Sequence, residues 1–209
     1  MGPQQAEEAL RTCLSVGADD VVLVSGREFG GSDTLATSYI ITCAIKKLEE
    51  QRGEKFDVIF CGKQAIDGDT GQVGPECAEH LGYPQITYAT EVVACDGKTI
   101  RIRKETVAGY EVLESAMPLV VSVTKTPSEL RNPNVRLRLA ANRAEIPVIT
   151  AQDLEGIIDL THCGLKGSPT RVKKSFTPVH DNNCTLIEAE TLSEAGTMLV
   201  DRLDADKKF

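Results

Sequence analysis

Several features that define common protein classes are missing from this 209-residue chain. No apolar run approaches the roughly 18 residues needed to cross a bilayer, and the stretch from Met1 to Leu10 lacks the basic start and apolar core of a leader peptide. We therefore expect no membrane insertion and a cytoplasmic location. A basic excess is also missing, because the formal net charge is −8. An acidic protein repels phosphate backbones, so nucleic acid is not an expected partner.

Metal and disulfide motifs are missing as well. The seven cysteines include no C-x-x-C pair, and an odd number of widely separated cysteines fits neither a zinc site nor a disulfide framework. We expect Cys13, Cys43 and Cys77 to be reduced thiols on the apolar faces of helices. The three histidines are scattered, with none at ligand spacing from another histidine or a cysteine. We therefore expect neither a metal site nor a catalytic histidine.

The first part of the chain alternates helical and strand patterns. Its 41% hydrophobic and 26% charged content is typical of a globular chain that is long enough for one α/β domain with a substantial core. Apolar periodicity predicts a helix over 4–16 and a buried strand over 21–25. Asp33 is the predicted N-cap of a second helix, and a doubly covered strand is predicted over 57–61. This order predicts a mostly parallel, Rossmann-like sheet whose carboxyl edge binds ligands.

After Pro84 the spacing of apolar residues changes from a helical period to the alternation typical of antiparallel strands. Residues 87–93 and 99–104 flank Asp96-Gly97, a strong hairpin signal, and a third strand is predicted over 110–115. A buried strand over 119–123 should return to the main sheet. We thus expect an α/β nucleotide-binding sheet flanked by helices, with an antiparallel edge extension and a C-terminal arm. The predicted division is a domain over 1–160 and an arm with a final helix over 161–209.

A glycine-rich loop follows the strand predicted over 57–61. Residues 62–74 are mostly small, polar or glycine, and Asp69 or Thr70 can cap the next helix. Free amides at a helix N-terminus attract a phosphate, and Gly68, Gly71 and Gly74 carry no Cβ to keep one away. The pattern matches neither G-x-G-x-x-G nor G-x-x-x-x-G-K-[ST]. Residue types alone therefore leave a phosphate cradle and an ordinary strand-to-helix turn equally open.

Two later segments suggest contacts with other proteins. The stretch SELRNPNVRLRLAANR, residues 128–143, predicts a polar loop that runs into a basic amphipathic helix with interleaved leucines. This helix is either a docking surface or a surface helix with its leucines in the core. Residues 164–178 are rich in glycine, proline and lysine, a composition typical of a segment that wraps a neighbour or stays mobile. Residues 191–203 predict a final amphipathic helix.

The stretch from Cys61 to Thr70, CGKQAIDGDT, continuing as QVGP over 72–75, resembles the signature loop of the electron transfer flavoprotein beta subunit. Segments 2–19, 124–147 and 164–178 are also similar to that family. The resemblance implies a heterodimer with an alpha subunit that carries FAD. It further implies electron transfer between a flavin dehydrogenase, such as an acyl-CoA dehydrogenase, and a quinone reductase or ferredoxin. The beta subunit of this family holds AMP or a second FAD.

The resemblance assigns roles to two groups of residues. The backbone amides of the loop would bind the phosphates, with the Thr70 hydroxyl and the Gln72 amide as additional donors. The implied cofactor-binding residues are Gly62, Lys63, Gln64, Ala65, Ile66, Asp67, Gly68, Asp69, Thr70, Gly71, Gln72 and Val73. The implied partner-docking residues are Arg136, Leu137, Arg138 and Leu139.

The family pattern begins with a strand and an adenine-binding loop that have no counterpart before Gly2-Pro3 in this sequence. We therefore expect a sheet in which one strand lacks a neighbour and exposes unpaired backbone. The family resemblance favours an electron-carrier subunit without catalytic residues of its own. The alternative is an ATP-using enzyme of the related α/β class, in which Lys63, Asp67 or Asp69 acts on the phosphates or a metal.

Overall fold

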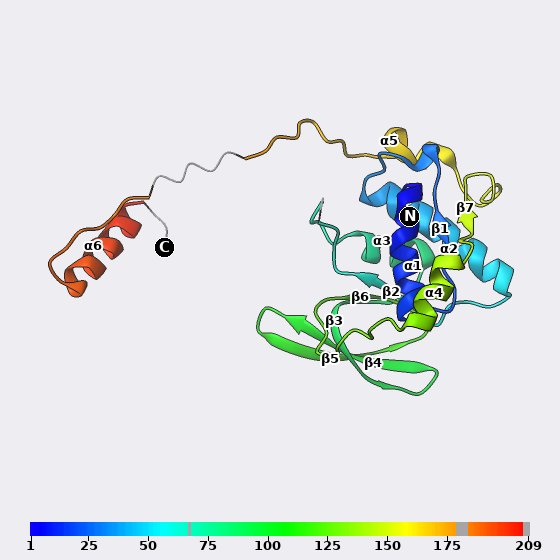
Figure 1. Ribbon diagram of the computed structural model, residues 1–209, viewed down its shortest axis with the longest axis horizontal. Helices are drawn as coiled ribbons and strands as arrows, with labels where there is room; N and C mark the ends of the chain where they lie inside the picture. Colours follow the sequence, from blue (N-terminus) through cyan, green and yellow to red (C-terminus); the bar gives the residue numbers. More distant parts are fainter. Residues whose placement is uncertain (67, 179–183, 207–209) are drawn as a thin grey trace. The chain divides into compact units, whose positions relative to one another are not determined.

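The computed structural model describes residues 1–66, 68–178 and 184–206 (Figure 1). The chain divides into two compact units, Met1–Arg171 and Val172–Phe209. The first unit contains all the strands and all the helices except α6, Leu192–Ala205. In the second unit, Thr191 caps α6 through a capping box with Glu194.

The predicted helices of the first part of the chain are confirmed. A short 3₁₀ turn, η1 (Gln4–Ala6), leads into α1, Glu7–Val16, which ends at Gly17 in the left-handed conformation. Helix α2, Thr34–Arg52, begins at Asp33, whose carboxylate accepts a hydrogen bond from the Ala36 amide at 3.0 Å. Its end is again a left-handed glycine, Gly53.

Five strands form the larger sheet, in the order β2-β6-β3-β4-β5. The first three are parallel: β2 (Val58–Gly62), β6 (Leu119–Val123) and β3 (Gln85–Cys95). The antiparallel strands β4 (Thr99–Thr106) and β5 (Gly109–Ala116) extend this sheet at the end drawn in green in Figure 1. The Asp96 carboxylate accepts hydrogen bonds from the Lys98 and Thr99 amides and so closes the predicted hairpin turn.

A second, two-stranded parallel sheet pairs β1 (Leu23–Val24) with β7 (Val148–Ile149). The expectation of one sheet that includes both early strands is therefore wrong. The strand predicted over 21–25 is also shorter than expected, because only Leu23 and Val24 pair with β7.

The prediction that the strand after Asp57 is covered on both faces is wrong. Strand β2 lies at an edge of the larger sheet and pairs only with β6 among the described strands. Cys61 points toward helix α3 (Val73–Leu81), since a Cβ on Gly74 would collide with its sulfur. Phe60 belongs to the opposite face and is 54% exposed. The other side of the β2 backbone is therefore unpaired among the described strands.

The two sheets have separate hydrophobic cores. One cluster joins α2 to β1 and β7 through Ile40, Val24 and Ile149, together with Leu154. The other lies within the larger sheet, where Ile100 and Ile102 of β4 belong to the same cluster as Leu119 and Val121 of β6. The antiparallel extension therefore shares its core with the parallel strands.

Arg101 and Arg103 lie on the polar face of β4, opposite the buried Ile100 and Ile102. Arg101 and Arg103 pair with Glu114 and Glu91, each at 2.7 Å. These four side chains are all substantially exposed, so we expect the two ion pairs to contribute little to the free energy of folding.

The remaining helical segments of the first unit are short. They are η2 (Arg27–Phe29), α4 (Val135–Arg143), η3 (Leu160–His162) and α5 (Gly164–Gly167). Helix α4 lies beside α1, where the Arg11 guanidinium donates to the carbonyls of Ala141 at 2.7 Å and Ala144 at 2.8 Å (Figure 1). No helix in the described ranges is long and apolar enough to cross a membrane.

All seven cysteines are free thiols. Cys43 and Cys77 are buried, as predicted, whereas Cys13 is exposed. The prediction for Cys13 is wrong because the face of α1 that carries it is not covered by another element.

Candidate functional site

The loop between β2 and α3 lies at the carboxyl end of the parallel strands. The Asp69 amide donates to the Ala65 carbonyl at 3.0 Å, and the Gln64 side-chain amide hydrogen-bonds to the Asp69 carboxylate. Asp69 and Gly71 both have left-handed backbones, with φ of 57° and 67°. These contacts and dihedral angles fold the loop into a tight turn. Asp67 lies outside the described residues.

The N-termini of two helices meet at this loop. Helix α3 begins at Val73, and its N-cap is Gln72 without a side-chain capping bond, so the predicted caps Asp69 and Thr70 are wrong. The Thr34 hydroxyl in the first turn of α2 lies 3.3 Å from Gln72 Oε1 and 3.4 Å from Glu76 Oε1. Both positive dipole ends are therefore close to the loop, an arrangement that favours an anion.

The three glycines of the proposed cradle have different surroundings. A Cβ on Gly68 would meet no atom within 4 Å, so there is space beside this residue. A Cβ on Gly71 would lie 3.3 Å from the Lys63 carbonyl oxygen. Gly74 lies in α3, where its missing side chain lets the helix approach Cys61 of β2. Gly74 therefore serves the packing of α3 on β2.

A carboxylate also contributes to the start of α2. Burial alone would raise the pKa of Asp33, but hydrogen bonds from the Ala36 amide and from the amide and hydroxyl of Thr170 outweigh it and lower the pKa. Ser168 adds a further link, since its hydroxyl accepts from the Asp33 amide at 2.8 Å. Asp33 thus joins the start of α2 to the segment that follows α5.

One residue at the same sheet edge was missed by the sequence analysis. The Lys63 ammonium lies 5.5 Å from the centroid of the Tyr88 ring, over its face. Tyr88 belongs to β3, and its side chain is 42% exposed. Nothing in the sequence pattern distinguishes Tyr88 from its neighbours in a strand rich in β-formers.

Known proteins match this chain over nearly its whole length. A family profile described as the electron transfer flavoprotein domain matches residues 1–154. The electron transfer flavoprotein subunit beta of Megasphaera elsdenii is 44% identical over 210 residues, which cover 99% of this chain and 77% of that protein. The corresponding subunit of Clostridium acetobutylicum is 46% identical, covering 97% and 74%. The protein FixA of Azorhizobium caulinodans is 38% identical, covering 96% and 72%.

This chain belongs to the electron transfer flavoprotein family. The resemblance that the loop after Cys61 indicated is therefore confirmed, and two of the three relatives named above are beta subunits. The matching loop is the one that the structure holds against the first turns of α2 and α3.

The second predicted site of this electron transfer flavoprotein chain lies on α4. Arg136 and Arg138 are exposed, Leu139 is 50% exposed and Leu137 is half-buried. The buried residue of the helix is Ala141 rather than a leucine. The four predicted docking residues therefore lie on or near an accessible surface, and the reading that places the leucines in the core is wrong for Leu139.

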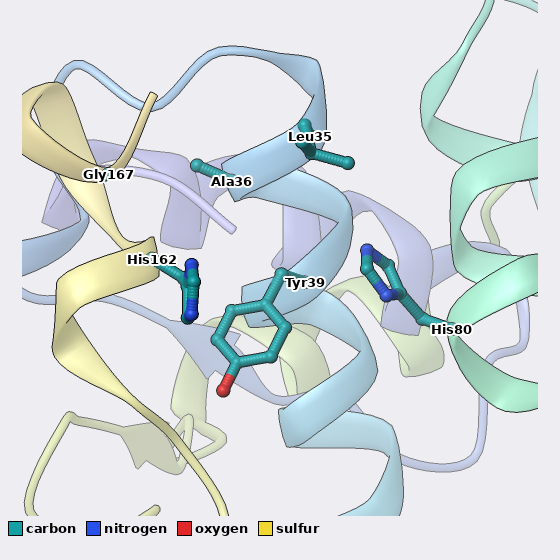
Figure 2. A pocket seen from close by; sticks show the side chains of 6 residues that line it. All are labelled: Leu35, Ala36, Tyr39, His80, His162 and Gly167. Atoms are coloured by element: carbon teal, nitrogen blue, oxygen red, sulfur yellow. The ribbon is translucent and has the colours of Figure 1, made fainter. Parts of the chain in front are cut away.

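A cavity of about 230 Å³ lies beside α2 and is lined by Leu35, Ala36, Tyr39, His80, His162 and Gly167 (Figure 2). The Tyr39 ring stands between the two histidine rings, edge-on to both, with centroids 5.8 Å and 5.7 Å away. Its hydroxyl accepts from the Asp159 amide at 2.8 Å. No spacing in the sequence indicates that the two scattered histidines meet around one tyrosine.

This cavity is separate from the predicted cofactor loop, because none of its six lining residues belongs to 62–73. Edge-to-face contacts of this kind stabilise packing between rings. Burial raises the pKa of Tyr39, so its hydroxyl stays protonated at neutral pH. We interpret the cavity as part of the packing of η3 and α5 on α2.

Proposed function

We propose that this electron transfer flavoprotein beta subunit binds AMP or a second FAD at the loop 62–73. The observation that carries this proposal is the meeting of the N-termini of α2 and α3 at the glycine-rich loop. A nucleotide phosphate fits there because backbone amides and two dipole ends favour negative charge. Thr70 and Gln72 would add side-chain donors, and Lys63 would add a positive charge.

We further propose that the chain forms a heterodimer with an alpha subunit that carries FAD, and works in the cytoplasm. Bound flavin would accept and pass on electrons, whereas AMP would have no redox role. The complex would carry electrons from a flavin dehydrogenase, such as an acyl-CoA dehydrogenase, to a downstream acceptor. The beta subunit itself would position the cofactor without catalytic residues of its own.

The alternative of an ATP-using enzyme finds little support in the loop. The Asp69 carboxylate, one of the groups that this alternative needs, is hydrogen-bonded to the Gln64 side-chain amide. The described residues also contain no group of three or more side chains that could hold a metal ion. We therefore favour the electron carrier.

Calorimetric titration of the heterodimer with AMP and with FAD tests the cofactor proposal. Alanine at Gly71 adds a Cβ 3.3 Å from the Lys63 carbonyl oxygen at a left-handed position, so it should distort the loop. We expect Gly71→Ala to weaken nucleotide binding by about tenfold, a loss of about 1.4 kcal/mol.

The matched control is Gly97→Ala. Gly97 is also left-handed, with φ of 85°, but lies at the β3–β4 turn with open space around it. This variant should carry a similar backbone strain and bind nucleotide like the wild type. Binding of neither AMP nor FAD by the wild type, or full affinity of Gly71→Ala, would contradict the assignment of the loop.

We propose that the second unit packs on the alpha subunit. No residue of α6 is buried, although Leu192, Met198 and Leu199 are large and apolar. The predicted arm and final helix, residues 161–209, would use this apolar face in the heterodimer.

A further inference from the structure

Helix α4, which carries the predicted docking residues, ends differently from the three long helices before it. Helices α1, α2 and α3 end at the left-handed glycines Gly17, Gly53 and Gly82, whose amides bond back to carbonyls of the last turn. Helix α4 ends at Ala144, whose backbone is extended, with φ of −64° and ψ of 135°. No glycine closes this helix, so its last carbonyls need another partner.

That partner is Arg11 of α1. Its guanidinium donates to the Ala141 carbonyl at 2.7 Å and to the Ala144 carbonyl at 2.8 Å. The positive charge also lies at the negative end of the α4 dipole. Glu7, one turn earlier on α1, places its carboxylate 3.6 Å from the same guanidinium, and both side chains are partly buried. Arg11 is therefore oriented by its own helix and caps another.

A second arginine makes the reverse contact. Arg131, three residues before the Asn134 N-cap of α4, lies against Gly17 at the end of α1, where a Cβ would be 2.6 Å from its Nη1. The end of α1 thus meets the start of α4, whereas Arg11 meets the end of α4. The two helices form an antiparallel pair, and Figure 1 shows them side by side.

Few other contacts fix α4. The helix has nine residues, and helices this short are marginal in water on their own. Ala141 is its buried residue, and Leu137, one turn earlier, is half-buried. Arg136 and Leu139 of the predicted docking surface are exposed. Because an alanine buries little apolar area, the position of α4 depends strongly on the two hydrogen bonds from Arg11.

We infer that α1 holds the docking surface of α4 in place, with Arg11 as the positioning residue. This inference rests on the docking role that the family resemblance gives to α4. A helix that moves presents Arg136 and Leu139 correctly for only part of the time, and the apparent affinity falls with that fraction. Arg11 fixes α4 before the dehydrogenase arrives, and so favours association without touching the partner.

Stopped-flow reduction of the heterodimer by an acyl-CoA dehydrogenase, at two ionic strengths, tests the inference. Arg11→Met keeps the length of the side chain and removes its donors. We expect association to slow by about tenfold, by the same factor at both ionic strengths, with dissociation unchanged. A loss that is much larger at low salt would overturn the inference, because Arg11 would then act on the partner by its charge.

Arg52→Met is the matched control. It removes an arginine from the end of α2, where the guanidinium pairs with the exposed Glu54, and so makes the same change in net charge. This control should associate like the wild type, and Arg11→Lys, which keeps a charge and donors, should recover most of the lost rate. Wild-type association of Arg11→Met, or equal slowing by Arg52→Met, would overturn the inference.

Amide hydrogen exchange of the heterodimer, without the dehydrogenase, separates positioning from general stability. Arg11→Met should speed exchange in α4 by about tenfold and leave α2 and the larger sheet unchanged. Faster exchange throughout the first unit would mean that Arg11 stabilises the whole fold, and would overturn a positioning role.

A second variant leaves Arg11 in place. Gly17→Ala should push Arg131 away from the end of α1, whereas Gly53→Ala adds a Cβ at a left-handed glycine with nothing within 4 Å. Both variants carry a similar backbone strain, so only Gly17→Ala should slow association. Equal rates for the two would contradict the role of α1. Failure of the docking surface itself is distinguished by wild-type rates after Arg136 and Arg138 are both replaced with Glu.

Discussion

At the scale of single residues, burial raises the pKa of several cysteine thiols and so lowers their reactivity. Burial raises the pKa of Cys77 to about 11 and that of Cys163 to about 11. It also raises the pKa of Cys43 and Cys61. Because the thiolate is the reactive form, these side chains act as small apolar core residues at neutral pH.

We expect alkylation by iodoacetamide to separate two groups of cysteines in the folded chain. Cys13 and Cys95 are exposed and should react quickly, whereas Cys77 and Cys163 should react only after unfolding. Peptide mass spectrometry at pH 8 measures this difference. Equal rates for Cys77 and Cys95 would contradict it.

The raised pKa values also predict the pH dependence of stability. The folded state favours the neutral thiol, so the contribution of Cys77 is complete below its ordinary pKa of 9.0 and is lost as pH rises toward 11. Denaturation curves across this range should show a Cys77→Ala variant losing less stability with pH than the wild type.

At the scale of the elements, one glycine sets how closely a helix approaches the larger sheet. Gly74 in the first turn of α3 lies against Cys61 of β2, and a Cβ there would collide with the sulfur atom. This approach brings the N-terminus of α3 to the carboxyl end of β2. The position of the cofactor loop therefore depends on this contact.

We predict that Gly74→Ala lowers the free energy of unfolding by about 1–3 kcal/mol, the usual cost of overpacking. Adding Cys61→Ala removes the sulfur and should recover most of that loss in a double-mutant cycle. Gly196→Ala in α6, where a Cβ meets nothing within 4 Å, is the control and should not destabilise. Additive losses in Gly74→Ala and Cys61→Ala would show that the two residues do not share this contact.

Helix α4 carries the predicted docking surface, and its charges and its leucine should act on different rate constants. Replacing Arg136 and Arg138 with Glu should slow association with an acyl-CoA dehydrogenase, most strongly at low salt, because exposed charges act through the on-rate. Leu139→Ala should instead speed dissociation, at a cost of about 1–3 kcal/mol if the side chain is a buried anchor in the complex.

Stopped-flow electron transfer at two ionic strengths measures both effects. A control that replaces Arg52 and Lys55 with Glu makes the same charge change at the end of α2 and beyond it. Equal rates for the wild type and the α4 variants would place the docking surface elsewhere. Equal slowing by the control would mean that net charge, and not α4, governs association.

At the scale of the whole molecule, the two units differ in how many apolar side chains they bury. Both hydrophobic clusters belong to Met1–Arg171, and no residue of α6 is buried. The larger unit therefore contains the core that stabilises the fold. Helix α6 has an apolar face that a partner can cover.

A chain that stops after Arg171 should keep the melting temperature of the full chain and bind the alpha subunit more weakly. The reason is that truncation removes apolar area that only the heterodimer would bury. Scanning calorimetry and titration with the alpha subunit measure the two effects. Unchanged affinity would mean that the arm and α6 do not pack on that subunit.

The sequence alone determined the features that depend on neighbouring residues. The Asp33 cap, the Asp96-Gly97 hairpin, the buried strand over 119–123 and the family signature after Cys61 could all be read within short windows, because capping, turn and periodicity effects are local. The place of the candidate loop, after β2 and before α3, was predicted for the same reason.

Only the tertiary structure decided which distant segments meet. It separated β1 from β2 into two sheets, left Phe60 on an open face, and brought His80 and His162 to either side of Tyr39. The place of Tyr88 in β3 likewise depends on an irregular register with β6, where the buried Ser122 hydroxyl accepts from the Tyr88 amide. Where two strands are far apart in the chain, their pairing depends on contacts between distant residues, which short windows of sequence do not contain.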